Sequence, residues 1–390
     1  MNFDRPTVRA GTHQVKWSAA EAALGLRGDD PLPMWVADMD FDAPQFLQDA
    51  VVDLARSGIL GYFSGLDACS EAVANWMRTR HGWDADPAHV LYTHGLGNGI
   101  AVCLQTLSEP GDGVVIFTPV YHEFTTKIRR NGRRPHECPL EVGADGRFEI
   151  DFDALEAGLT GDERIMLISS PHNPAGRIWT PEEQRRMAQV CERHDMILIS
   201  DEIHHDLVLP GQTHVPMPVA VPEVTDRLVV MAAASKTFNV AGARTGCLIV
   251  PDDTLREKLQ TALKASDIQP NIFGVEITRE AYRQGAGWVD SLTAYLAENI
   301  RVFSEGVAEI PGLSAMPMQA TYLAWVDFAP LGMSPEEVSR RVVEEARLGP
   351  SPGPAFGTGG ETAMRFNLGT QRARVEEAVS RLQAAFADVQ

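Results

Sequence analysis

Five lysines occur in the 390 residues, and one of them, Lys236, lies in a setting suited to covalent chemistry. It directly follows the apolar run from Val229 to Ala234, which is typical of a buried strand leaving a sheet. Desolvation at such a strand end lowers the pKa of a lysine, so the neutral amine becomes available to form a Schiff base. We expect the other four lysines to be ordinary surface residues: Lys16, Lys127, Lys258 and Lys264.

Three more polar residues follow predicted strands in the same way. Tyr121 follows the first of four strands, Asn173 the second and Asp201 the third, while Lys236 follows the fourth. Taken singly, each could shape a turn or cap a helix. Ligands of open α/β sheets bind outside the carboxyl ends of the strands, so we expect these side chains to converge. The strands are predicted by four apolar runs: 114–117, 165–168, 196–199 and 228–231.

The order of the elements predicts an α/β fold. From about residue 90, short apolar runs alternate with amphipathic helical stretches, which is typical of a mostly parallel sheet with helices on both faces. Thr180, Pro181 and Glu183 supply the cap, first-turn proline and capping-box glutamate of a helix. Near residue 285 the pattern changes to longer helices and weaker strands, which predicts a smaller α+β domain. The Gly- and Pro-rich stretch 349–360 is typical of a linker, or of tight turns near a ligand.

Composition excludes several classes of partner. The formal net charge of −19 argues against nucleic acid and anionic membranes, which are bound by clustered Lys and Arg. The five cysteines are odd in number and widely spaced, which indicates reduced thiols. No run of 18 apolar residues occurs, and the first residues lack the apolar stretch of a signal peptide. We therefore expect a cytoplasmic protein.

Two other chemistries are disfavoured. A nicotinamide dehydrogenase would explain the glycines, but Gly95-x-Gly97 is followed by Ile100 where the dinucleotide motif requires glycine. A zinc enzyme could use His204 and His205, yet adjacent residues at a strand end point to different sides. No third ligand at a suitable spacing is found, so we expect no metal.

A Schiff-base lysine combined with an acid that protonates a ring nitrogen is what a protein supplies to pyridoxal phosphate. The chain resembles the fold type I pyridoxal-phosphate enzymes of the aspartate aminotransferase superfamily. More narrowly, it resembles the MalY/PatB group of cystathionine β-lyase-like carbon–sulfur lyases. The resemblance spans nearly the whole chain and is carried by Pro-Met-Trp-Val-Ala-Asp-Met-Asp-Phe at 33–41, Pro-His-Asn-Pro at 171–174, Asp-Glu-Ile-His at 201–204 and Ser-Lys-Thr-Phe-Asn-Val-Ala-Gly at 235–242.

The resemblance implies pyridoxal 5′-phosphate as cofactor. Lys236 would attach it covalently and then move the Cα proton of the substrate, while Asp201 would hold the proton of the ring nitrogen. Tyr121 would stack on the ring. The other cofactor contacts that it implies are Asn173 and His204 at the 3′-oxygen, and Gly97, Asn98, Ser235 and Arg244 around the phosphate.

The resemblance also implies how substrate and subunits are arranged. Arg365 would bind the carboxylate of an amino-acid substrate, with Ala37 and Asn173 beside it. Tyr62 matches a tyrosine that reaches the phosphate of the neighbouring subunit, which implies a homodimer with shared active sites. The domains would be an N-terminal arm that packs with the small domain, a large cofactor-binding domain and a small C-terminal domain, at 1–44, 45–285 and 286–390.

Several reactions remain open within this chemistry. The first is β-elimination from cystathionine or a cysteine S-conjugate, which gives a thiol, pyruvate and ammonia. The runner-up is an aminotransferase, and a third is decarboxylating or oxidative deamination of a cysteine conjugate. His122 follows Tyr121 where relatives often have proline, which indicates an altered substrate pocket. A non-catalytic regulatory protein is a different class of answer, and the joint presence of Lys236, Asp201, Asn173 and Arg365 argues against it.

Overall fold

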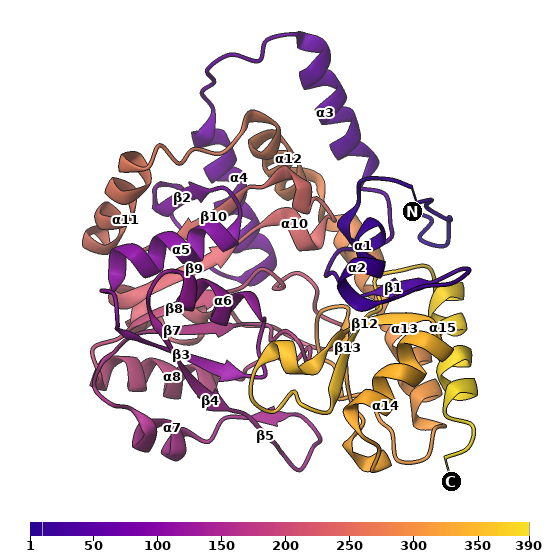
Figure 1. Ribbon diagram of the computed structural model, residues 1–390. Helices are drawn as coiled ribbons and strands as arrows, with labels where there is room; N and C mark the ends of the chain where they lie inside the picture. Colours follow the sequence, from indigo (N-terminus) through magenta and orange to yellow (C-terminus); the bar gives the residue numbers. More distant parts are fainter. Residues whose placement is uncertain (10, 390) are drawn as a thin grey trace.

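A computed structural model of the protein describes residues 1–9 and 11–389. Its centre is a seven-stranded sheet in the order β2-β10-β9-β8-β7-β3-β4, in which β10 runs antiparallel to both neighbours and the other pairs are parallel (Figure 1). The four predicted strands are β3, β7, β8 and β9, so the predicted α/β fold is confirmed. The strands are β2 Val90–Thr93, β3 Gly113–Thr118, β4 Arg134–Pro139, β7 Glu163–Ser169, β8 Ile197–Asp201, β9 Leu228–Ala232 and β10 Gly246–Ile249.

Helices cover both faces of this sheet because its strands are apolar on both sides. Val114 and Ile116 of β3 pack in one buried cluster with residues of α5, α6 and α11, whereas Val115 and Phe117 pack in another with residues of α4 and α8. The helices around the sheet are α4 Leu66–His81, α5 Leu96–Leu107, α6 Glu123–Arg130, α7 Phe152–Gly158, α8 Pro181–Arg193, α9 Met217–Ala220, α10 Ala234–Thr237, α11 Asp253–Ala265 and α12 Ile272–Gln284.

The helix predicted from Thr180 onward is α8, and its capping box is confirmed. The Thr180 side chain accepts a hydrogen bond from the backbone N–H of Glu183, and the Glu183 carboxylate accepts one from the backbone N–H of Thr180. Pro181 occupies the first helical position. None of the helices in the described part of the chain has the length and apolar character that crossing a bilayer requires.

A second sheet, in the order β1-β12-β13-β11, packs against α13 and α15 through a separate buried cluster (Figure 1). Its strand β1 comes from the N-terminal segment and pairs in parallel with β12. The domain boundaries at residues 44 and 285 remain a prediction. The elements outside the central sheet are α1 Val15–Ser18, α2 Ala20–Leu24, β1 Leu32–Met34, α3 Gln45–Ser57, β5 Glu141–Val142, β6 Phe148–Glu149, α13 Ala286–Ala308, β11 Leu323–Asp327, α14 Pro335–Ser339, β12 Leu348–Pro352, β13 Ala363–Asn367 and α15 Arg372–Ala385.

The stretch 349–360 is not a linker. It forms most of β12 and a 3-10 turn at Gly353–Phe356, and both are packed into the second sheet. Gly353 is required by close packing, because a Cβ atom there would lie 2.1 Å from the carbonyl oxygen of Gly360. The glycines and prolines therefore make tight backbone turns, which was the other interpretation of this composition.

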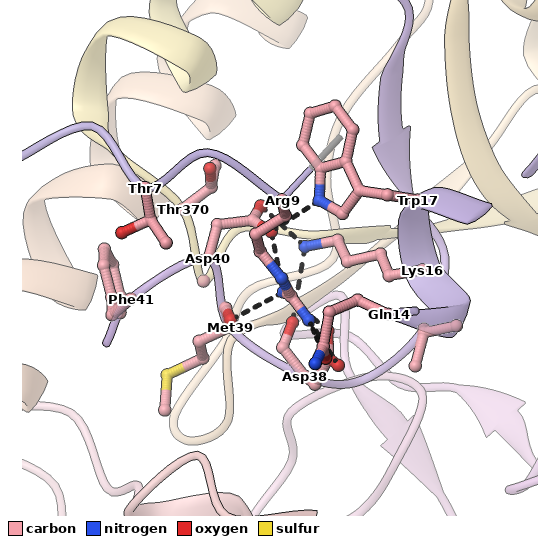
Figure 2. A network of polar contacts seen from close by, with 12 residues as sticks. Thr7, Arg9, Gln14, Lys16, Trp17, Asp38, Met39, Asp40, Phe41 and Thr370 are labelled. Atoms are coloured by element: carbon pink, nitrogen blue, oxygen red, sulfur yellow. Dashed lines mark hydrogen bonds and ion pairs between the residues drawn. The ribbon is translucent and has the colours of Figure 1, made fainter. Parts of the chain in front are cut away.

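Lys16 is buried, so the prediction of a surface residue is wrong. Its side chain is 0% exposed, and its Nζ donates to Asp40 Oδ2 at 2.8 Å. Figure 2 shows that Arg9 contacts both Asp38 and Asp40, and that the Trp17 ring N–H also donates to Asp40. Burial alone would raise the pKa of Asp40, but Lys16 and Arg9 hold it below its usual value. The network fixes the N-terminal segment onto the loop that follows β1.

Replacing Lys16 with alanine should strongly destabilise the fold, because Asp40 would lose its nearest cation within a buried cluster. We expect the free energy of unfolding to fall by about 3 kcal/mol, measured by urea unfolding followed by tryptophan fluorescence. The matched control is Lys258→Ala, since Lys258 is exposed on α11, and it should change stability by less than about 0.5 kcal/mol. Equal effects of the two substitutions would contradict this account.

Candidate active site

The four residues predicted to converge do meet at the carboxyl edge of the central sheet. Asp201 ends β8 and pairs in register with Ser169 at the end of β7. The backbone N–H of Tyr121, which follows β3, donates to the carbonyl oxygen of Asn173 at 3.0 Å. Lys236 lies in the short helix α10 directly after β9. The adjacent parallel strands thus bring the four residues into one cluster.

The Lys236 amine donates to the carbonyl oxygen of Ala37 at 2.5 Å. Burial lowers the pKa of Lys236 to about 8, so roughly a tenth of the amine is neutral at pH 7 and about half at pH 8. The same Ala37 oxygen accepts a hydrogen bond from the Tyr322 hydroxyl at 3.0 Å. The structure therefore holds the Lys236 amine at a fixed point of the site, beside Ala37 and Tyr322.

Asp201 is a buried acidic side chain that has no cationic partner in the described part of the chain. Among the described residues it forms no ion pair, and its side chain accepts one hydrogen bond, from the backbone N–H of Ile203 at 3.2 Å. Burial raises the pKa of Asp201 to about 7, and Lys236 offsets part of that rise. The carboxylate can thus accept a hydrogen bond from a cationic N–H donor on a ligand.

Arg365 is the opposite case, a buried guanidinium with no acidic partner among the described residues. It donates to Asn173 Oδ1 at 2.9 Å, to the carbonyl oxygen of Trp35 at 2.6 Å and to Ser351 Oγ at 3.1 Å. Within the described part of the chain its Nε has no hydrogen-bond partner, and burial lowers the pKa of Arg365 to about 10. A carboxylate ligand would complete this set of donors.

Asn173 and His204 leave polar atoms available between these charges. Asn173 uses its Oδ1 to accept from Arg365, which leaves its amide N–H groups as donors. His204 is buried and packs edge-on against Tyr322, and its Nδ1 has no partner among the described residues. Burial lowers the pKa of His204 well below its usual value, so the ring is neutral. Both side chains can hydrogen-bond a ligand oxygen.

The residues predicted to bind a phosphate lie at two adjacent chain turns. Gly97 and Asn98 stand in the first turn of α5, although the backbone N–H of Asn98 already donates to the carbonyl oxygen of Gly95 at 3.1 Å. Ser235 lies in α10, and Arg244 follows a 3-10 turn in a left-handed conformation with φ of 49°. The exposed Arg244 has no ion-pair partner among the described residues, which leaves its charge available to an anion.

Tyr121 faces the same cluster. Burial raises the pKa of Tyr121 to about 12, and Glu123 and Asp201 raise it further, while Arg365 and Arg244 act in the opposite direction. Its ring packs edge-on against His122 and Phe124. The phenol is therefore neutral.

Tyr62 is not brought to the cluster. Its side chain is fully exposed and forms no hydrogen bond with another described residue. The segment between α3 and α4, which contains Tyr62, lies at the outer edge of the molecule, where α3 projects away from the body (Figure 1). Within one chain, Tyr62 has no role in the site.

The structure adds residues that the sequence reasoning missed. Trp35 and Ser351 hold Arg365, and the guanidinium lies 4.8 Å from the centroid of the Phe356 ring. Asn239 binds the backbone of Met39 through both its oxygen and its amide. The sequence patterns did point to the regions that contain these residues. Trp35 and Asn239 lie in the family-like stretches 33–41 and 235–242, and Ser351 and Phe356 lie in the Gly- and Pro-rich stretch 349–360.

Residues 36–382 match the family model of aminotransferase class I and II. The chain belongs to this family. It is 36% identical to cystathionine beta-lyase PatB of Bacillus subtilis, over 99% of this chain and 100% of that protein. It is 33% identical to protein MalY of Escherichia coli, over 98% and 97% of the two chains. The crystal structure of a PLP-bound C–S lyase from Staphylococcus hominis superposes with a TM-score of 0.91 at 29% identity, over 99% and 98% of the chains. The resemblance drawn from the sequence is confirmed, as is the fold type.

Proposed function

We propose that the protein is a pyridoxal-phosphate-dependent carbon–sulfur β-lyase that converts cystathionine or a cysteine S-conjugate to a thiol, pyruvate and ammonia. The similarity to PatB and to the C–S lyase covers nearly all of each chain. The observation that carries the proposal is the gathering of an amine, a buried carboxyl group and a buried guanidinium, at Lys236, Asp201 and Arg365, with no ion pair to any of them among the described residues.

The side chains fit the cofactor in chemistry as well as in position. Lys236 would attach it, Asp201 would accept the hydrogen bond of the protonated ring nitrogen, and Tyr121 would cover the ring. Its 3′-oxygen would be held by Asn173 and His204, and its phosphate by Gly97, Asn98, Ser235 and Arg244. When bound, the cofactor supplies an electron sink that stabilises negative charge at the substrate Cα.

The protein's own groups then have distinct tasks. Arg365, with Asn173 and the backbone of Ala37 beside it, binds the substrate carboxylate and so orients the Cα–H bond. Lys236 has a pKa near 8 and can both accept the Cα proton and release it close to neutral pH. Burial of Asp201 and Arg365 keeps water away from the charges that direct the reaction.

Replacing Asp201 with asparagine should impair turnover far more than cofactor retention, because an amide cannot hold the proton of the ring nitrogen while the phosphate contacts persist. We expect a loss of roughly 100- to 5,000-fold in kcat, from a cost of about 3 to 5 kcal/mol. The measurement is kcat together with cofactor content by absorbance. The exposed Asp226→Asn is the control. Near wild-type turnover of cofactor-saturated Asp201→Asn would overturn the role given to this carboxylate.

The reaction type is tested by incubating the cofactor-loaded enzyme with cystathionine and several S-substituted cysteines, with no keto acid added. We expect thiol, pyruvate and ammonia in equal amounts over many turnovers, and none of them from Lys236→Ala. The exposed Lys258→Ala should retain full activity. Product formation that stops after one turnover and resumes with a keto acid would identify an aminotransferase. Carbon dioxide released with an aldehyde would identify decarboxylating deamination.

We also infer a homodimer in which Tyr62 of one chain completes the phosphate contacts of the other. Ile59 and Leu60 beside it are 77% and 54% exposed, and such a run of exposed apolar side chains is typical of an interaction surface. A partner on this surface would bury these side chains and bring Tyr62 to a site. The cytoplasmic location also stays a prediction, and it is supported by five buried, unpaired cysteines.

The shared site is tested by mixing two variants, Tyr62→Phe, which should be impaired, and Lys236→Ala, which should be inactive. Random pairing of subunits should regenerate native sites, to about a quarter of the total, because each mixed dimer contains one site with both native residues. Activity of the mixture and the mass in solution are measured together. A monomeric mass with full activity would contradict the proposal.

A further inference from the structure

We propose that the protein binds one divalent transition-metal ion of the zinc class at a site formed by His81, His205 and Asp206. The site is separate from the cofactor site and does not depend on the proposed function. Its ligands come from the carboxyl end of α4 and from the segment after β8, which are 125 residues apart at His81 and Asp206. The sequence offers no third ligand beside the adjacent His204 and His205, and His204 is not part of this site. The fold instead brings His81 to His205 and Asp206.

The spacing of the three residues suits a small tetrahedral ion. His81 Nε2 lies 2.8 Å from Asp206 Oδ1, and His205 Nε2 lies 3.4 Å from Asp206 Oδ2. One ligand atom from each residue lies within 4.8 Å of the other two. Bonds of about 2.0 to 2.1 Å around tetrahedral zinc place neighbouring ligand atoms roughly 3.4 Å apart. Small side-chain movements are therefore enough to surround an ion.

His205 is the residue that the protein alone does not account for. Its side chain is 1% exposed, and neither ring nitrogen makes a hydrogen bond of good geometry among the described residues; Nε2 has only the 3.4 Å contact with Asp206 Oδ2. Buried polar atoms are nearly always well paired, so an imidazole with one long contact and one unpaired nitrogen is unusual. A hydrogen bond from His81 to Asp206 explains His81 without an ion, but it leaves His205 unexplained. An ion bound by the lone pair of His205 Nε2 would give that nitrogen a partner.

Asp206 is held in place as a metal-binding carboxylate would be. Its Oδ1 accepts a hydrogen bond from Trp76 Nε1 at 2.9 Å, and its Oδ2 accepts one from Thr237 Oγ1 at 2.9 Å. Outer contacts of this kind fix the orientation of ligating carboxylates and strengthen binding. Two imidazoles and one carboxylate match the donors that zinc and neighbouring metals prefer.

The site can be reached from solvent. A cleft of about 350 Å³ is lined by all three ligands and by His214 and Arg80, and it leaves room for water as the fourth ligand. The positive charge of Arg80 is compensated, because its guanidinium pairs with Asp290 at 2.9 Å. An ion can therefore enter without meeting an unpaired cation at the mouth of the cleft.

Binding is measured by titrating ZnCl2 into the chelator-treated, cofactor-loaded protein in a calorimeter. A parallel titration with Co²⁺ is followed by its ligand-field absorption. We expect one Zn²⁺ per chain in the wild type and a loss of affinity of roughly 100-fold in His205→Ala. Removing a residue that only supports a metal ligand typically costs about 10- to 100-fold, so the loss of a ligand should lie at the upper end of that range. His13→Ala is the control, because His13 is an exposed histidine in the N-terminal segment, outside the cluster.

His205→Gln serves as a second variant that retains side-chain volume, and far-ultraviolet circular dichroism and cofactor absorbance confirm that each variant is folded. Loss of binding in either folded His205 variant, with the control unchanged, supports the site. Absence of one-to-one binding by the wild type overturns it. So does wild-type affinity in a folded His205 variant.

Discussion

The hydrogen bond from the Lys236 amine to the carbonyl oxygen of Ala37 joins parts of the chain that are 199 residues apart. One part is the short helix α10 that follows β9, and the other is the segment 35–41, which crosses the site between β1 and α3. The positions of the amine and the guanidinium both depend on that segment being fixed, because it carries the contacts of the two groups. Arg365 binds it at Trp35, and Asn239 binds it at Met39.

The N-terminal ion network belongs to the same arrangement. Lys16 and Arg9 hold Asp40, and Asn367 binds the carbonyl oxygens of Val36 and Asp38. A backbone segment without regular structure is thus tied from both sides. The result is a carbonyl oxygen at a defined position, against which the lysine amine is placed.

The site contains charges that the protein leaves unbalanced. Burying an ionised group without a partner costs free energy, and the raised pKa of Asp201 and the lowered pKa of Arg365 record that cost. A ligand with a cationic nitrogen at one end and a carboxylate at the other would offset both. A cofactor and an amino-acid substrate together have these features, so the protein is organised around groups that it does not itself contain.

Local patterns in the sequence were sufficient for much of this picture. The apolar runs predicted β3, β7, β8 and β9. The rule that ligands bind at the carboxyl ends of strands then predicted that four residues would lie together: Tyr121, Asn173, Asp201 and Lys236. Contacts between segments that are distant in the sequence could not be predicted from these local patterns. Burial of Lys16 depends on Asp40 and Arg9, and the stretch 349–360 acquires strand structure by pairing with β1 and β13. His81 lies near His205 because the fold packs α4 against the segment that follows β8. No local pattern in the sequence predicts this contact.

The central claim is that Lys236 holds the cofactor, and chemical trapping tests it most directly. Reducing the cofactor-loaded protein with borohydride fixes pyridoxal phosphate to its lysine, and peptide mass spectrometry then locates it among the five lysines. The account predicts a single modified peptide that contains Lys236. A pyridoxyl group on Lys16, Lys127, Lys258 or Lys264, with Lys236 unmodified, would contradict it.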